Sequence, residues 1–213
     1  MHKTGGRIYF ENFPRDGNIR VGHWWPETPA SGTVIILHGR TEFIEKYTET
    51  IKDLTQRRYE VWSMDWRGQG LSRKTFTHPR KGHIDKFETY LLDLEYFLDT
   101  IIKPRAIQPL ILAHSMGAHI AVRALLENRA KFLGLIVTSP MFDLPLNGAK
   151  ARFVRLAARL GQLAGLGEMF VPGTGDYDPE SIHFSHDTKL GKDVVIQPNV
   201  TFGPGVWIED NVE

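Results

Sequence analysis

The stretch "PLILAHSMGAHIAVRAL", which covers residues 109–125, decides the fold of this chain. It opens with aliphatic residues typical of a buried strand and closes with apolar residues at helical spacing. Between them lies Ser115, with Ala113 and Gly117 two residues to either side. A sharp strand-to-helix turn that raises a serine above a sheet needs small residues at these positions, because larger ones collide there. The stretch therefore predicts such a turn, with Ser115 at its apex.

Ser115 can be interpreted in two ways. A serine hydroxyl attacks a carbonyl only when a base takes its proton and nearby donors stabilise the oxyanion. The helix that follows directs its N-terminal dipole at the same point, which favours a nucleophile. The alternative is structural, since serine is also a favoured residue for capping a helix N-terminus.

A second strand ending supports the catalytic interpretation. The run "GTVIILHG", residues 32–39, is a short apolar strand that closes with a His-Gly turn. We expect the backbone N–H groups of Arg40 and Met116 to donate to the oxyanion, and Gly39 to allow the sharp exit. A His-Gly turn is common by itself, but its combination with a serine turn two strands later is not.

The rest of the first 140 residues alternates strands with helices. Residues 7–10 and 18–25 surround a Pro-Arg-Asp-Gly turn, which predicts a hairpin. Further apolar runs predict buried strands, and apolar residues at helical spacing predict helices between them: strands at 32–39, 59–65, 109–113 and 132–140, helices at 44–58, 84–101 and 119–127. This order favours right-handed crossovers and a mostly parallel sheet, so the fold class is α/β.

Three motifs in this order, "LHGRTEFIEKY", "VWSMDWRGQGLSRK" and "LAHSMGAHIAVRAL", resemble the bacterial lysophospholipase and monoacylglycerol lipase branch of the α/β-hydrolase family. The resemblance covers about residues 5–180. It implies a serine hydrolase of carboxylic esters of single-chain glycerolipids, with no cofactor and no metal. It also implies that Ser115 is the nucleophile and that Met116 and Arg40 are the oxyanion donors. A loop with an implied structural role matches the family's D-x-R-G-x-G pattern at Asp65, Arg67, Gly68 and Gly70.

The acid and the histidine of a catalytic triad are not evident. On this fold the order is serine, acid, histidine, and the resemblance implies that the last two follow a seventh and an eighth strand. Asp143 is more typical of a turn cap, while His183 and His186 come after no further sheet strand, and His114 and His119 lie too close in sequence to the nucleophile. A triad without its histidine keeps only residual catalysis, so we expect impaired activity.

The end of the chain has a different period. Residues 184–213 divide into five hexads, FSHDTK, LGKDVV, IQPNVT, FGPGVW and IEDNVE. Each begins with Phe, Leu or Ile and has Thr or Val at its fifth position, which is typical of a parallel β-helix. The tail resembles the left-handed β-helix of hexapeptide acyltransferases, above all N-acetylglucosamine-1-phosphate uridylyltransferase. That resemblance implies three hexads to a coil, so the tail forms less than two coils.

Two parts are therefore expected. Residues 1–180 form an α/β-hydrolase domain that lacks its last strands, and residues 184–213 form a hexapeptide-repeat fragment. The leading hypothesis for function is the impaired serine hydrolase. The alternative is a hexapeptide-type acyltransferase or trimerisation fragment fused to an inactive hydrolase remnant, although no histidine follows His186 to act as an acyl-transfer base.

Composition limits the partners and the compartment. Lys+Arg number 26 against 25 Asp+Glu, so no nucleic-acid partner is expected. The chain has no cysteine, which fits a reducing compartment, and no signal peptide or spanning helix is evident, so a cytoplasmic location is expected. The helix expected from residue 149 has no acid up to residue 160. It either lies on an anionic lipid surface, peripheral to the inner membrane, or presents a solvated basic face. The oligomeric state stays open.

Overall fold

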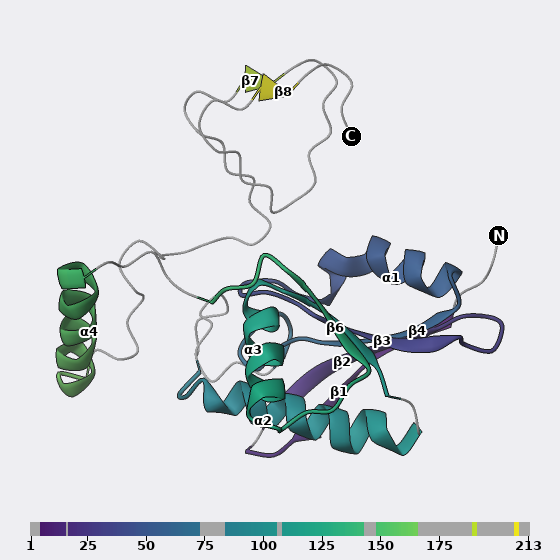
Figure 1. The fold of residues 1–213 in the computed structure, drawn as a ribbon, viewed down its shortest axis with the longest axis horizontal. Helices are drawn as coiled ribbons and strands as arrows, with labels where there is room; N and C mark the ends of the chain where they lie inside the picture. The colour runs from purple at the N-terminus through teal and green to yellow at the C-terminus, as the bar shows by residue number, and fades with distance from the viewer. Residues whose placement is uncertain are drawn as a thin grey trace. The chain divides into compact units, whose positions relative to one another are not determined.

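The computed structural model describes residues 5–15, 17–72, 84–105, 108–142, 148–165, 189–190 and 207–208 (Figure 1). The chain divides into two compact units, Met1–Met169 and Phe170–Glu213. The predicted boundary at residues 181–183 lies outside the described residues.

The first unit contains a six-stranded sheet in the order β1-β2-β4-β3-β5-β6. The strands are β1 (Gly5–Phe13), β2 (Gly17–Trp25), β3 (Gly32–Leu37), β4 (Tyr59–Met64), β5 (Leu110–His114) and β6 (Gly134–Thr138). β1 and β2 form the predicted antiparallel hairpin, and β2 pairs with β4 in the antiparallel sense. The pairs β3–β4, β3–β5 and β5–β6 are parallel, which confirms the mostly parallel α/β sheet.

Helices lie on both faces of this sheet (Figure 1). They are η1 (Ile44–Tyr47), α1 (Thr48–Gln56), α2 (Glu88–Tyr96), η2 (Phe97–Ile102), η3 (Lys103–Arg105) and α3 (Ser115–Leu126), and a separate helix α4 (Gly148–Leu163) follows later in the chain. The helix predicted from His119 thus begins four residues earlier, at the serine itself. Within the described part of the chain, no helix combines the length and apolarity that crossing a bilayer requires.

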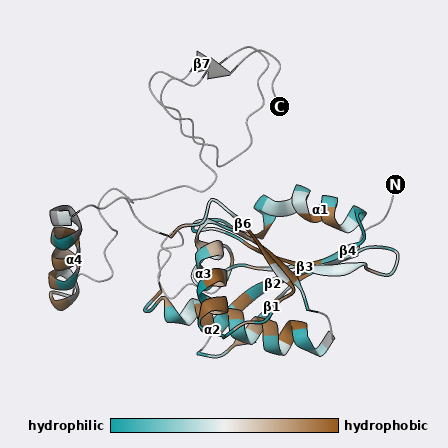
Figure 2. Ribbon diagram, viewed as in Figure 1, coloured by the Kyte–Doolittle hydropathy of each residue, from teal (hydrophilic) through white to brown (hydrophobic). Residues whose placement is uncertain are grey.

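The alternation of side chains along each strand explains why the apolar runs are continuous. In β3, Val34 and Ile36 pack with Ile51 of α1, whereas Ile35 and Leu37 face the opposite side. That second and larger cluster receives the apolar faces of α2 and α3: Leu91, Leu94, Ile120, Ala121 and Ala124. Figure 2 shows hydrophobic residues in the sheet and on parts of α2 and α3. A strand covered on both faces needs no polar side, as expected for parallel sheets.

The outermost strand departs from this pattern. β6 forms one edge of the sheet and pairs with β5. Its side chains Ile136 and Val137 are exposed, at 56% and 39%, and so are Leu126 and Leu133 close to its start. At this edge a buried-type strand sequence remains uncovered.

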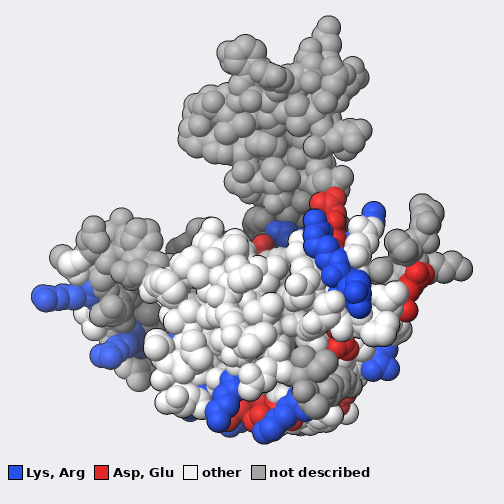
Figure 3. All heavy atoms as spheres, turned by 45° about the vertical axis from the view of Figure 1, so that its right-hand side comes forward, with Lys and Arg blue, Asp and Glu red and all other residues white. Residues whose placement is uncertain are grey.

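Charges of both signs lie around the same unit. On the face shown in Figure 3, Lys and Arg side chains lie close to Asp and Glu side chains in several places, beside a broad uncharged area. Among the ion pairs are Arg129 with Glu88 and Arg123 with Glu88, which join α2 to the end of α3. Exposed pairs of this kind contribute little stability, about 0–1 kcal/mol each.

The second unit contributes two short strands, β7 (Lys189–Leu190) and β8 (Trp207–Ile208), which pair in parallel. Lys189 ends the first hexad and Trp207 ends the fourth, so the paired residues lie three hexads apart. One coil of a left-handed β-helix has the same length in hexads. This register supports the hexapeptide-repeat fragment that the tail sequence predicts.

Candidate active site

The turn between β5 and α3 has the predicted sharp bend. Ser115 lies in the left-handed region at φ 49°, although it is not a glycine. Such a conformation costs about 1–3 kcal/mol and persists only where the surroundings enforce it. The residue at the N-cap position is His114, and its side chain makes no capping hydrogen bond. Ser115 is the first helical residue and is half-buried, so its position is not that of a capping serine.

Small residues surround this bend for steric reasons. A Cβ atom at Gly117 would collide with the carbonyl oxygens of Leu37 and His38, because α3 begins directly against the end of β3. A Cβ atom at Gly39 would lie 3.1 Å from Cβ of Ser115. The two predicted glycine positions therefore allow the His-Gly turn and the serine turn to touch.

The turn after β3 presents one backbone donor and restrains its neighbours. The Gly39 N–H donates to Oε2 of Glu42 at 2.7 Å, and the Thr41 N–H donates to Oε1 of Gln69 at 2.7 Å. Between them, the Arg40 N–H donates to no atom of the described residues. Met116 lies in the first turn of α3, where backbone N–H groups have no intrahelical acceptor. Both predicted oxyanion donors are thus N–H groups at the ends of neighbouring strands β3 and β5.

The carboxylate of Glu42 is part of this turn. Burial disfavours its charge, but the hydrogen bonds from the Gly39 N–H and from the Tyr47 hydroxyl, at 2.9 Å, outweigh burial and hold the pKa of Glu42 below its usual value. Burial, together with the Glu42 charge, raises the pKa of the Tyr47 hydroxyl. Glu42 is therefore an ionised acceptor that fixes the turn around Arg40.

His38 holds the same turn from inside the core. It is fully buried, its Nδ1–H donates to the Gly39 carbonyl at 2.7 Å, and its Nε2 accepts the Trp66 N–H at 3.2 Å. Burial lowers the pKa of the His38 imidazole. Since both ring nitrogens are engaged and the ring is neutral, His38 has a structural role.

The D-x-R-G-x-G loop is held by its own charged residues. The buried Asp65 carboxylate accepts the Ile44 and Leu71 N–H groups, each at 2.9 Å, and a bond from Arg20 at 3.2 Å. Gly70 has φ 51°, and a Cβ atom there would collide with that carboxylate. A bidentate ion pair then joins the loop to α2: Arg67 with Asp93, at 2.6 and 2.8 Å. The geometry agrees with the structural role that the resemblance implies.

The described part of the chain does not pair Ser115 with a base. Its hydroxyl makes no hydrogen bond to any described residue. Nδ1 of His114 lies 3.0 Å from the Thr138 hydroxyl of β6, and Nδ1 of His119 lies 2.8 Å from the Met141 carbonyl oxygen. The other triad candidates of the sequence lie outside the described residues: Asp143, His183 and His186.

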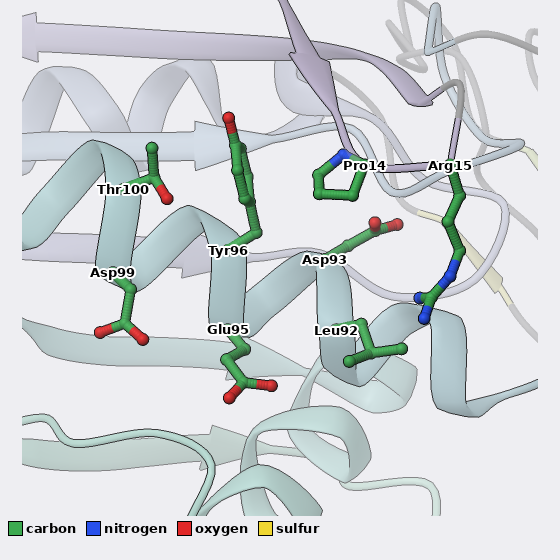
Figure 4. Close-up of a pocket in the computed structure, with 8 residues that line it drawn as sticks. All are labelled: Pro14, Arg15, Leu92, Asp93, Glu95, Tyr96, Asp99 and Thr100. Carbon is green, nitrogen blue, oxygen red and sulfur yellow. The ribbon is translucent and has the colours of Figure 1, made fainter.

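A separate hollow of about 350 Å³ lies beside α2 (Figure 4). Arg15 of the β1–β2 turn and three carboxylates of α2 and η2 surround it, and none of the turn residues around Ser115 lines it: Pro14, Arg15, Leu92, Asp93, Glu95, Tyr96, Asp99 and Thr100. Burial raises the pKa of Asp93 against the opposing effect of Arg67. This hollow therefore lies where the D-x-R-G-x-G loop is joined to α2 through Asp93.

Two residues of the site are not singled out by the sequence. Glu42 and Gln69 both lie inside motifs that are recognised for other residues, the His-Gly turn and the D-x-R-G-x-G loop. Their hydrogen bonds to Gly39 and Thr41 are visible only after folding. Their location in the sequence could have indicated them, since each polar side chain follows the end of a buried strand at the edge where Ser115 lies.

Comparison with known proteins gives a long match to hydrolases and a short match to a second protein. Residues 28–189 match the family described as "Serine aminopeptidase, S33". A probable lysophospholipase L2 of Haemophilus influenzae is 30% identical over 190 residues, which cover 84% of this chain and 59% of that relative. The bifunctional protein GlmU of Paramagnetospirillum magneticum is 61% identical over 36 residues, 17% of this chain and 8% of that protein, and the match fits the hexad tail.

Solved structures agree on the fold. A soluble variant of monoglyceride lipase from Saccharomyces cerevisiae, crystallised with a substrate analogue, has a TM-score of 0.57 at 22% identity. The likeness covers 74% of this chain and 53% of the lipase, and at this identity it shows the α/β-hydrolase fold. The chain spans about three fifths of the length of the Haemophilus relative.

Proposed function

Because the chain belongs to the α/β-hydrolase family described as serine aminopeptidase S33, we propose that it hydrolyses carboxylic esters of single-chain glycerolipids through an acyl-enzyme on Ser115. It is a lysophospholipase-like and monoglyceride-lipase-like α/β-hydrolase. The observation that carries the proposal is the left-handed Ser115 in contact with the Gly39 turn. A strained serine beside an N–H donor is the arrangement that acyl transfer needs.

The proposed reaction has two steps. Oγ of Ser115 attacks the ester carbonyl, and the resulting oxyanion accepts hydrogen bonds from the N–H groups of Arg40 and Met116. The intermediate collapses to an acyl-serine as the glycerol-side alcohol leaves with the proton that the Ser115 hydroxyl has given up. Water then attacks the acyl-serine, releasing the fatty acid and restoring the serine hydroxyl.

We propose that turnover by this chain is weak. The histidines described near Ser115 are engaged with Thr138 and with the Met141 carbonyl, and neither is hydrogen-bonded to its hydroxyl. An oxyanion hole and substrate binding without a working triad retain a residual acceleration of about 10³–10⁴ over water. We therefore expect slow labelling and slow hydrolysis.

The proposal includes a lipid surface as the place where substrate is met. In α4, the exposed side chains comprise Phe153, Leu156 and Leu160 together with the cations Arg152 and Arg159. Residues 149–160 contain no acid that would oppose binding to anionic lipid. A basic amphipathic helix of this kind lies in the membrane interface, with its apolar side chains among the acyl chains. We therefore propose a cytoplasmic protein with peripheral contact to the inner membrane.

A fluorophosphonate probe tests the proposed nucleophile, because it forms a covalent bond with a serine hydroxyl that acts as a nucleophile. We expect covalent labelling of the full chain, abolished in Ser115→Ala, while Ser139→Ala, a matched control, labels like wild type. Ser139 also has a positive φ, 43°, but it follows β6 and is not part of the turn between β5 and α3. Slow release of fatty acid from a lysophospholipid or a monoacylglycerol, again lost in Ser115→Ala, would support the substrate class.

No labelling of folded wild-type chain would overturn the nucleophile. Labelling without release from either lipid would overturn the substrate class while leaving the nucleophile in place. The fold of Ser115→Ala is checked by circular dichroism, because a loss of labelling through unfolding would otherwise resemble the expected result.

A second candidate function rests on the tail. The parallel pairing of β7 with β8 three hexads apart, together with the match to GlmU, favours a hexapeptide-type acyltransferase or a trimerisation fragment joined to an inactive hydrolase remnant. A solenoid of this kind needs at least three stacked repeats for stability, and residues 184–213 make fewer than two coils.

A further inference from the structure

The residue whose position is least explained by sheet packing is Gln69. It lies between Gly68 and Gly70, both in the left-handed region, at φ 74° and 51°. Its side chain is a neutral amide with 7% exposure, which is unusual for glutamine. The Arg67–Asp93 ion pair holds the loop before Gln69, and the Leu71 N–H, donated to Asp65, holds it after Gln69. The backbone therefore delivers this amide to the edge of the sheet near Ser115.

The hydrogen bonds of Gln69 connect three separate elements. Its Oε1 accepts the Thr41 N–H at 2.7 Å, its Nε2 donates to the Tyr90 hydroxyl of α2 at 3.3 Å, and the same nitrogen lies 3.8 Å from Sδ of Met116. A backbone N–H can only donate, so the amide oxygen must face Thr41 and the amide nitrogen must face α2 and α3. Gln69 thus touches the residue after one proposed oxyanion donor and the side chain of the other.

The turn that Gln69 holds is strained. Thr41, a β-branched residue, has φ 60°, where such residues are rarely found. The hydrogen bond from its N–H to Gln69 spans 28 residues and fixes the peptide between Arg40 and Thr41. With the Gly39 N–H taken by Glu42 and the Thr41 N–H taken by Gln69, the Arg40 N–H is the donor left between them.

We propose that Gln69 is a positioning residue of the oxyanion hole. It keeps the Arg40 and Met116 N–H groups directed at one point by fixing the Thr41 peptide on one side and Met116 on the other. This inference rests on the proposed function for its catalytic meaning, but its structural part stands apart from activity.

The test compares Gln69→Met with wild type in the full chain. Methionine fills the space and keeps a soft contact with Met116, but it offers the Thr41 N–H no comparable acceptor. With a fluorophosphonate probe, we expect the maximal labelling rate to fall about tenfold or more, while the half-saturating probe concentration changes less than twofold. Loss of a whole oxyanion donor costs about 10²–10³, so a misdirected one costs less.

Tyr90→Phe is the matched control. It removes the hydroxyl at the other end of the Gln69 amide and leaves the bond to Thr41 intact, so labelling should stay within twofold of wild type. A merely structural role of Gln69 would lower the melting temperature of Gln69→Met without separating the maximal rate from half-saturation. Equal maximal rates in Gln69→Met and wild type would overturn the inference.

Amide hydrogen exchange decides the inference if wild type is not labelled, which would itself refute the proposed function. We expect slow exchange at the Thr41 N–H and fast exchange at the Arg40 N–H in wild type. Protection at Thr41 should disappear in Gln69→Met and persist in Gln69→Glu, which keeps an acceptor oxygen. If Gln69→Met does not fold, the wild-type pattern alone decides, and fast exchange at both amides overturns the inference.

Discussion

At the scale of single residues, the serine turn depends on the absence of two side chains. Gly117 is needed because α3 starts against the carbonyl oxygens of Leu37 and His38, and Gly39 is needed because Ser115 lies beside it. The strain at Ser115 is therefore sustained by close packing on both sides of the bend. Removing that fit should destabilise the fold before it alters any chemistry.

Gly117→Ala tests this packing. We expect a loss of about 1–3 kcal/mol in the free energy of unfolding, because one methyl group must displace backbone atoms that have no free space. Urea denaturation measures the change. The matched control is Gly161→Ala in α4, where an added Cβ atom meets nothing within 4 Å and alanine favours the helix. Equal destabilisation by both substitutions would contradict the argument.

The buried imidazole of His38 gives a pH dependence with a definite sign. In the folded state, burial lowers the pKa of His38 below its ordinary value of 6.5. As the pH falls below 6.5, the unfolded chain therefore binds a proton that the folded chain does not. The stability that neutral His38 contributes is present above pH 6.5 and is lost as the pH falls toward the folded-state pKa. The slope cannot exceed about 1.4 kcal/mol per pH unit for one proton.

Chemical denaturation at pH 7.5, 6.5 and 5.5 measures this effect. We expect the free energy of unfolding of wild type to decrease when the pH is lowered from 6.5 to 5.5. His38→Asn keeps a polar group but cannot take the proton, so it should be less stable at pH 7.5 and show a flatter profile. A profile as steep as that of wild type would assign the dependence to other groups.

At the scale of elements, the apolar side chains that remain exposed are the informative ones. α4 exposes Phe153 by 72% and Leu163 by 85%, and β6 exposes Ile136. The helix carries cations among its exposed residues, whereas the strand is an edge of the sheet. The exposed face of α4 fits an anionic lipid surface. The unpaired edge of β6 favours self-association.

Vesicle sedimentation tests the helix. Wild-type chain should bind vesicles that contain phosphatidylglycerol and bind phosphatidylcholine vesicles several-fold less, since each cation near an anionic surface contributes about 1 kcal/mol. Phe153→Glu combined with Leu160→Glu should abolish binding. Phe10→Glu, at an exposed position of β1, is the control and should bind like wild type. Equal binding to neutral and anionic vesicles would contradict the electrostatic part.

At the scale of the whole molecule, the two units differ in the packing that can stabilise their described residues. The first buries a core on both faces of its sheet, while the described part of the second consists of two paired two-residue strands. If the tail is a trimerisation fragment, analytical ultracentrifugation of the full chain should give a trimer. Val206→Asp should then yield monomers without affecting Ser115 labelling, because the fifth position of each hexad is expected to face the coil interior. A wild-type monomer would remove this candidate.

The sequence predicts much of the first unit and part of the site. Apolar runs give the strands, and the spacing around Ser115 gives the bend, because both follow from local sterics and side-chain periodicity. The helix after the serine begins earlier than predicted, because Ser115 is already its first residue and Met116 packs in the core together with Ile120 and Ala124. The nucleophilic role of Ser115 and the donor roles of Arg40 and Met116 stay predictions.

The sequence by itself determined the parallel sheet, the two glycine positions and the register of the hexads, since each depends on residues close together in the chain. Only the tertiary structure decided which side chains restrain the turn around Arg40. The bond from Thr41 to Gln69 spans 28 residues, and Gln69 reaches Met116 across 47. No local pattern encodes such contacts, because they exist only when β3, β4 and β5 end at the same edge of the sheet.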